Sequence, residues 1–85
     1  MEQQQFALLA SADAITDVCV CQSSFDTPDP YSVLVWANND KEPQTILTAR
    51  GERREWSNLE RLNDWIRRHG YTGQIRLLLK RAQAI

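Results

Sequence analysis

The chain has 85 residues, of which 42% are hydrophobic and 25% charged, and a formal net charge of −1. This length accommodates one domain, and the composition is that of a globular protein rather than a disordered one. No run approaches the ~20 apolar residues that span a bilayer, and the N-terminus lacks the basic region of a signal peptide. We therefore expect a single domain over residues 1–85, located in the cytoplasm and without a membrane segment.

The first two segments differ in how clearly they predict structure. Residues 1–14 fit a short helix, a flexible segment or the start of a longer strand. Residues 15–23 are rich in valine, isoleucine and threonine, which favours a strand. Cys19 and Cys21 lie two residues apart on it, so their side chains share one face but are too far apart for ordinary disulfide geometry. With one histidine and no second cysteine pair in the chain, we expect reduced thiols and neither a metal nor a cofactor.

A β-hairpin is predicted in the middle of the chain. Residues 31–37 are rich in β-branched and aromatic side chains, and two prolines just before them mark a loop. Residues 38–42 contain asparagine and aspartate, which tolerate the positive φ of a hairpin turn. Residues 43–49 then form the returning strand. Trp36, on the first strand of this hairpin, is expected in the core.

An amphipathic helix is predicted over residues 57–69. Ser57 is placed as its N-cap, and Glu60, three residues later, would complete a capping box. Gly70 would supply the left-handed residue that ends the helix. The apolar residues that recur at helical spacing are Leu59, Leu62, Trp65 and Ile66. The arginines of the helix fall mostly on the opposite face.

The last predicted element is a strand over residues 74–80. Together the elements define an α+β fold, a two-layer sandwich in which an antiparallel β-meander is followed by one amphipathic helix and a final strand, in the order β-β-β-α-β. The helix makes the last strand parallel either to the preceding strand or to the first. One helix leaves the second face of the sheet uncovered, where we place Val33, Val35 or Leu78. We expect a homodimer to cover that face.

Positive charge is concentrated in the second half of the chain. Residues 1–49 hold seven acids and one base, whereas residues 50–85 hold four acids and nine bases. Such a split indicates an anionic partner, unless the two halves pair with each other across the fold. The sequence pI of about 5.7 is lower than that of a dedicated DNA-binding domain.

Seven residues are candidate contacts for an anionic partner: Arg50, Arg53, Arg54, Trp56, Arg61, Arg67 and Arg68. Arginine presents a planar fork of N–H donors to phosphate or carboxylate, and tryptophan offers a stacking surface. Interleaved glutamates can neutralise part of this charge, so a solvated face without a partner is the alternative. Trp56 has two interpretations, a lid over the helix N-terminus and an exposed anchor for a partner.

Between residues 45 and 79 a strand leads into Arg-Gly-x-x-Arg, an aromatic residue, a serine, a leucine-containing helix, a glycine and a further strand. The residues that carry this pattern are Arg50, Gly51, Arg54, Trp56, Ser57, Leu59, Leu62, Ile66 and Gly70. The pattern resembles small partition-associated proteins carried by bacterial plasmids and integrated elements. The resemblance implies an accessory protein of a mobile element that acts near DNA or on a DNA-bound partner.

The sequence favours binding over catalysis. It has no glycine-rich phosphate loop, no HExxH, no GxSxG and no CxxC pair. We therefore expect a non-enzymatic interaction protein that binds a protein partner at DNA. The alternative is direct, weak binding of nucleic acid by the arginine cluster of residues 50–68.

Overall fold

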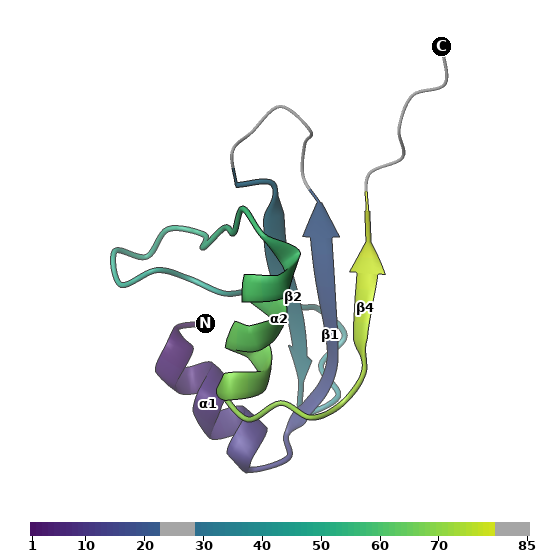
Figure 1. The fold of residues 1–85 in the computed structure, drawn as a ribbon. Helices are drawn as coiled ribbons and strands as arrows, with labels where there is room; N and C mark the ends of the chain where they lie inside the picture. The colour runs from purple at the N-terminus through teal and green to yellow at the C-terminus, as the bar shows by residue number, and fades with distance from the viewer. Residues whose placement is uncertain (23–28, 80–85) are drawn as a thin grey trace.

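The computed structural model describes residues 1–22 and 29–79. Its elements in chain order are α1 (Gln3–Ser11), β1 (Ile15–Gln22), β2 (Tyr31–Ala37), β3 (Gln44–Thr45), α2 (Leu59–Arg68) and β4 (Ile75–Leu78). They form a four-stranded sheet with two helices, which confirms the predicted α+β class (Figure 1). The order α-β-β-β-α-β differs from the predicted β-β-β-α-β because the N-terminal segment folds as a helix. The two-layer sandwich stays a prediction.

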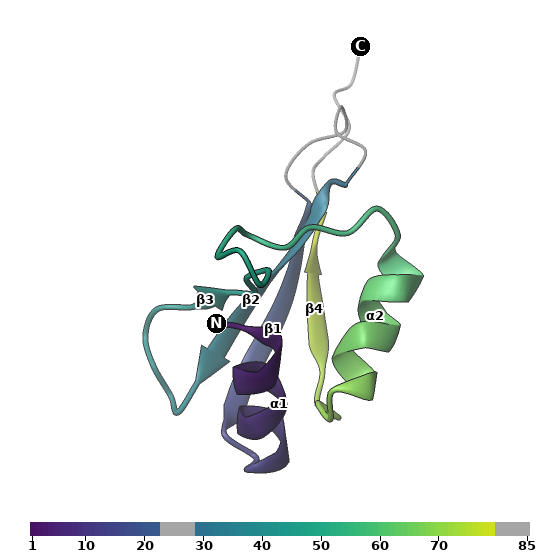
Figure 2. The same cartoon turned by 90° about the vertical axis from the view of Figure 1, so that its left-hand side faces the viewer.

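The strands lie in the order β3-β2-β1-β4. β1 pairs with β2 and β2 with β3 in antiparallel ladders, while β4 pairs with β1 in a parallel one. The last strand is therefore parallel to the first, one of the two predicted arrangements. α2 connects β3 to β4 and lies against one face of the sheet (Figure 2).

The hairpin between β2 and β3 turns where the sequence predicted. Asn38 and Asn39 have φ of 54° and 60°, and the Asp40 N–H donates to the Ala37 carbonyl at 2.9 Å. Positive φ at both central residues is typical of the type I′ turn that joins two twisted strands. The ladder between β2 and β3 is short, because it contains only the pairs Leu34–Thr45 and Val35–Gln44 among the described residues.

β3 has two residues, whereas the predicted strand covered residues 43–49. The chain leaves the ladder because Thr48 Oγ1 accepts hydrogen bonds from the N–H groups of Arg50 and Glu52, both at 3.3 Å. Gly51 continues the turn with φ of +83°. Threonine hydroxyls of this kind compete with a sheet ladder for the backbone. Ser23 and Lys80, at the ends of two predicted strands, lie outside the described residues.

α2 begins at Leu59, two residues after the predicted start at residue 57, and its N-cap is Asn58 rather than Ser57. Asn58 is extended, with φ of −135° and ψ of 124°, and its Oδ1 accepts a hydrogen bond from the Arg61 N–H at 3.1 Å. Ser57 lies exposed outside the helix. The predicted capping box of Ser57 and Glu60 is therefore wrong, because asparagine competes equally well for the N-cap position.

α2 ends at Arg68, one residue before the predicted end, and the predicted glycine stop follows it. Gly70 has φ of +102°, and its N–H donates to the Arg67 carbonyl at 3.1 Å. The Tyr71 N–H donates to the Ile66 carbonyl at 3.4 Å. These two bonds form the Schellman motif, in which a glycine adopts the left-handed conformation without steric cost.

The core lies between the sheet and the helices. α2 contributes Leu62, Trp65 and Ile66, and α1 contributes Phe6, which is fully buried. The valines that meet them from β1 and β2 are Val18, Val20, Val33 and Val35. The prediction that Val33 and Val35 lie on an uncovered face is thus wrong. Dimerisation itself stays a prediction.

The other face of the sheet carries no helix in the part of the chain that the structure describes. Leu78 lies there and is 65% exposed. Trp36, predicted in the core, is only partly buried, and the guanidinium of Arg76 lies 5.3 Å from its ring. We call the face of the sheet that carries Trp36, Arg76 and Leu78 the open face.

Neither α1 nor α2 is long and apolar enough to cross a bilayer, and no other helix occurs in the described ranges.

Candidate anion-binding site

Three of the six predicted arginines converge on one shallow depression. Arg54, Arg61 and Arg68 line it together with Trp56. Asp64 and Trp65 complete the lining, and neither was among the predicted contacts. We call this set of six residues the arginine–tryptophan site.

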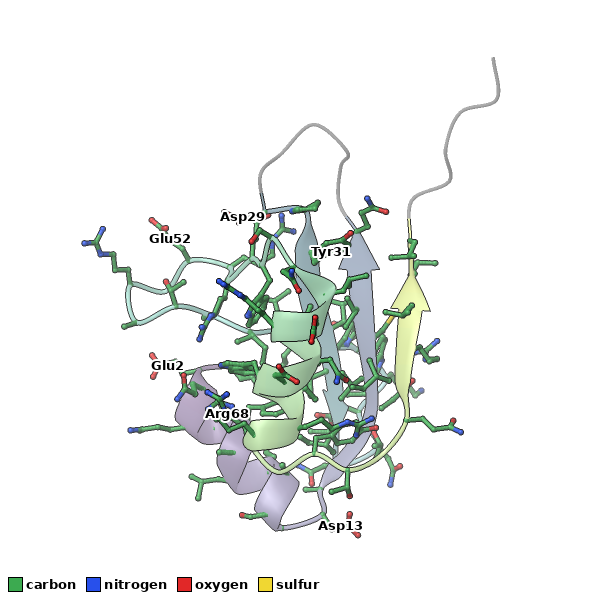
Figure 3. The ribbon with its side chains drawn as sticks, viewed as in Figure 1. Glu2, Asp13, Asp29, Tyr31, Glu52 and Arg68 are labelled. Atoms are coloured by element: carbon green, nitrogen blue, oxygen red, sulfur yellow. The ribbon has the colours of Figure 1, made fainter. Side chains whose placement is uncertain are left out.

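Four of these residues come from one face of α2. They are Arg61, Asp64, Trp65 and Arg68, which follow the i, i+3, i+4, i+7 spacing that brings helical side chains together. Figure 3 shows Arg68 projecting from α2 toward the side where α1 lies. The spacing is a signal that the sequence contains. It also fits a core position for Trp65, which the structure confirms with an exposed fraction of 8%.

The loop before α2 supplies the other two residues and is tied to the sheet. The Trp56 N–H donates to the Tyr31 carbonyl at 2.8 Å, and the Tyr31 N–H donates to the Trp56 carbonyl at 3.1 Å. The Arg54 N–H donates to the Ile46 carbonyl at 2.8 Å. These bonds place the Trp56 side chain in the core, 8% exposed. Trp56 is therefore not an exposed anchor.

The guanidinium of Arg54 is held over two indole rings. Its central carbon lies 5.0 Å from the ring of Trp56 and 5.4 Å from that of Trp65. Nη1 also approaches Gln3 Oε1 at 3.5 Å, at the limit of a hydrogen bond. Attraction between a cation and an aromatic face fixes the side chain while leaving most of its N–H donors available.

Trp65 connects the site to the core through aromatic contacts. Its ring centroid lies 5.2 Å from Phe6, 5.3 Å from Trp56 and 4.5 Å from His69. His69 is the C-cap residue of α2, and its Nδ1 lies 2.7 Å from the Trp65 carbonyl oxygen. Within the described residues, the buried Nε1 of Trp65 has no hydrogen-bond partner.

Within residues 1–22 and 29–79, the three arginines of the site have no ionic partner. Among the described residues, no carboxylate lies within 4.0 Å of the side-chain nitrogens of Arg54, Arg61 or Arg68. Asp64 lines the same depression but forms no ion pair with these arginines, at 4.0 Å or less, among the described residues. The site thus combines three positive charges with one negative charge, and it can accept a carboxylate or a phosphate.

The remaining predicted arginines lie elsewhere. Arg67 Nη1 donates to the carbonyls of Tyr71 at 3.1 Å and Gly73 at 2.6 Å, so Arg67 supports the turn before β4. Arg53 forms an ion pair with Glu55 at 3.8 Å, on the protein surface. Arg50 lies exposed at the loop tip. The predicted set is therefore three arginines at one site and three outside it.

Comparisons of this chain with protein-family models, with curated proteins and with solved structures gave no match. The resemblance of residues 45–79 to partition-associated proteins therefore stays a prediction. The chemistry of the arginine–tryptophan site rests on its own geometry.

Proposed function

We propose that this protein is a non-enzymatic interaction protein that binds an acidic segment of a protein partner through Arg54, Arg61 and Arg68. The observation that carries the proposal is the convergence of three guanidinium groups, from a loop and a helix, on one depression. None has a carboxylate partner among the described residues. An acidic segment would supply those carboxylates, and each contact would be a charge-assisted hydrogen bond.

The position of Arg54 supports a site that is formed before the partner arrives. Its guanidinium is held by the rings of Trp56 and Trp65, and both rings are fixed in the core. A side chain that is already ordered loses less conformational entropy when it binds. Arg61 and Arg68, one on each side of Asp64 along α2, are exposed and free to close on the bound segment.

The burial of both indoles favours a protein partner over nucleic acid. Trp56 and Trp65 are each 8% exposed and pack edge to face at 5.3 Å. Neither presents a free face on which a base can stack, and such stacking supplies much of the binding of single strands. Duplex binding relies on phosphate contacts spread along the DNA backbone. A compact site of three arginines that also contains Asp64 suits a short acidic peptide better.

The resemblance of residues 45–79 supports a place for this interaction. It suggests that the partner is bound at DNA and that the protein is a cytoplasmic accessory factor of a bacterial mobile element. A homodimer would double the number of sites and strengthen binding to a partner with repeated acidic segments. Sedimentation at high micromolar concentration tests that dimer directly.

Binding of fluorescein-labelled hexaglutamate, followed by fluorescence anisotropy at about 50 mM salt, tests the proposal. The informative variant combines Arg61→Gln and Arg68→Gln. Its matched control combines Arg50→Gln and Arg53→Gln, which removes the same charge from residues outside the depression. We expect the first pair to weaken binding by about tenfold, since an exposed ionic contact contributes up to ~1 kcal/mol. The control pair should weaken it less than about twofold.

Three other results would overturn the proposal. The wild-type protein could fail to bind hexaglutamate, or both pairs could weaken binding equally, which would indicate non-specific charge attraction. Duplex or single-stranded DNA could also bind more tightly than the peptide and depend on all four arginines. That last result would establish the alternative function, direct binding of nucleic acid by residues 50–68. Circular dichroism of each variant controls for folding.

A further inference from the structure

The open face of the sheet carries a pair of thiols that the proposed function does not use. Cys19 and Cys21 alternate on β1 with Val18 and Val20, which face the core, so both cysteines lie on the opposite side. Their sulfur atoms are 3.8 Å apart, and both thiols are free. Cys19 is 5% exposed, whereas Cys21 is only partly buried and connects the pair to solvent.

The neighbouring strands surround the pair with one cation and mostly uncharged groups. Leu34 on β2 and Arg76 on β4 are the ladder partners of Cys19. Ser32 and Leu78 are those of Cys21. No group of three or more His, Cys, Asp or Glu side chains that could hold a metal occurs among the described residues. Within the described ranges, the two sulfur atoms are therefore the side-chain ligands that this place offers a metal ion.

Two sulfur ligands select a narrow class of metal ion. Zinc sites use four ligands in a tetrahedron, or three with an open position, and calcium and magnesium require oxygen. Soft thiolates bind Cu(I), zinc and iron–sulfur clusters, and of these Cu(I) is the one that is stable with two ligands in a nearly linear arrangement. With the ~2.3 Å metal–sulfur bond of zinc thiolates as a guide, linear coordination needs sulfurs ~4.6 Å apart. Small rotations of Cys19 and Cys21 about χ1 would open their 3.8 Å separation to that distance.

We infer that Cys19 and Cys21 form a two-coordinate binding site for a soft monovalent metal ion, Cu(I). In the binding step each thiol loses its proton to water, and the two thiolates each form one bond to the ion. No electron is transferred, and the resulting bis-thiolate complex carries one negative charge. A disulfide is the poorer outcome for this pair, because residues i and i+2 of a strand have Cα atoms ~6.7 Å apart, at the upper limit for disulfides.

Arg76, which forms an ion pair with Asp17, brings a positive charge next to that complex. It is the direct neighbour of Cys19 across the parallel ladder, and its Nε donates to Asp17 Oδ1 at 3.3 Å. An arginine guanidinium is charged throughout the ordinary pH range, and the hydrogen bond to Asp17 raises the pKa of Arg76 further. A fixed cation beside a metal thiolate is not a ligand, but it changes the affinity for the metal, as residues around metal sites commonly do.

Anaerobic titration with Cu(I), in competition with the chelator bathocuproine disulfonate, tests the inference on the whole chain. We expect one ion per chain, with an ultraviolet band from thiolate-to-copper charge transfer. Cys19→Ser and Cys21→Ser should each lower the affinity by more than about 100-fold, since even residues outside the ligand set change it by 10–100-fold. Arg76→Gln should lower it by about tenfold. Arg53→Gln, an arginine far along the chain from both cysteines, is the control and should leave it unchanged.

Each other result overturns the assignment. Copper retained equally by Cys19→Ser and Cys21→Ser would place the metal elsewhere. No binding in competition with the chelator would remove the site altogether. One ion per two chains would indicate a bridge between molecules rather than a site within β1. Zinc(II) binding as tight as Cu(I) would contradict two-coordinate selection. Because serine is close to cysteine in size, circular dichroism should show both variants folded.

Discussion

The two faces of the sheet differ in what covers them, and this difference separates stability from chemistry. On the covered face, four valines pack beneath the helices and are at most 2% exposed: Val18, Val20, Val33 and Val35. On the open face, Trp36 is partly buried, Leu78 is 65% exposed, and Arg76 forms an ion pair with Asp17. Consecutive residues of β1 therefore have different roles, because side chains alternate along a strand.

The comparison teaches that the covered face should determine whether the protein folds. Burial of apolar area is the main favourable contribution, and a domain of this size buries a limited amount of it. Substitutions under α2 should therefore cost much more than the same substitutions on the open face. Four measurements can break or sharpen this expectation.

The largest effect is expected for Leu62→Ala, because Leu62 is fully buried between α2 and the sheet. Removing its side chain should lower the free energy of unfolding by about 2–5 kcal/mol. The identical change at Leu78 on the open face should alter it by no more than about 0.5 kcal/mol. Urea denaturation measures both. Should Leu62→Ala fail to fold, Leu62→Met keeps the volume and should cost less than about 1.5 kcal/mol. Equal costs at the two leucines would contradict the comparison.

The next effect is at the end of the helix that covers the sheet. Gly70 has φ of +102°, which places a β-carbon at a steric cost. Gly70→Ala should therefore destabilise the protein by about 1–2 kcal/mol. Gly70→Asn should cost less, because asparagine tolerates positive φ. Thermal denaturation by circular dichroism compares the two variants, and an alanine variant as stable as wild type would argue against this C-cap.

A smaller effect distinguishes the observed N-cap of α2 from the predicted one. Asn58→Ala removes the side-chain acceptor of the Arg61 N–H and should cost about 1 kcal/mol. Ser57→Ala should leave stability nearly unchanged, since Ser57 lies outside the helix and is exposed. The midpoints of urea denaturation decide between them. A larger loss for Ser57→Ala would restore the predicted capping box.

The last prediction concerns the ionisation of Cys21 on the open face, which should have no effect on stability at neutral pH. Burial, followed by the contact with Cys19, raises the pKa of the Cys21 thiol from 9.0 to about 11. The alkylation rate of Cys21 by iodoacetamide should therefore keep rising with pH beyond 9, because the thiolate is the nucleophile. Peptide mass spectrometry of quenched samples measures this rate.

The same shift has a consequence for stability. The unfolded chain loses the Cys21 proton near pH 9 and the folded chain near pH 11. The free energy of unfolding should accordingly fall as pH rises through that window and be unaffected below it. A rate of alkylation that levels off at pH 9 would contradict both statements.

Most of the helix α2 and of the hairpin could be predicted, but the binding site only in part. Gly70 and the turn at Asn38 and Asn39 follow from backbone preferences that each residue carries with it. Of the arginines, helical spacing places Arg61 and Arg68 on one face of α2, but nothing in the sequence indicates that Arg54 joins them. Arg67 and Arg68 are adjacent in the chain, yet one supports the turn before β4 and the other lines the depression.

The sequence by itself determined the elements whose signals are local, which are the period of α2, its glycine stop, the two long strands and the turn between β2 and β3. These depend on φ, ψ and side-chain spacing within a few residues, so no distant partner is needed. The tertiary structure decided that β4 joins β1, that Val33 and Val35 face the helices, and that Arg54 meets Arg61 and Arg68. These outcomes depend on contacts between segments far apart in the chain, whose energies are set by burial and packing after the chain has closed on itself.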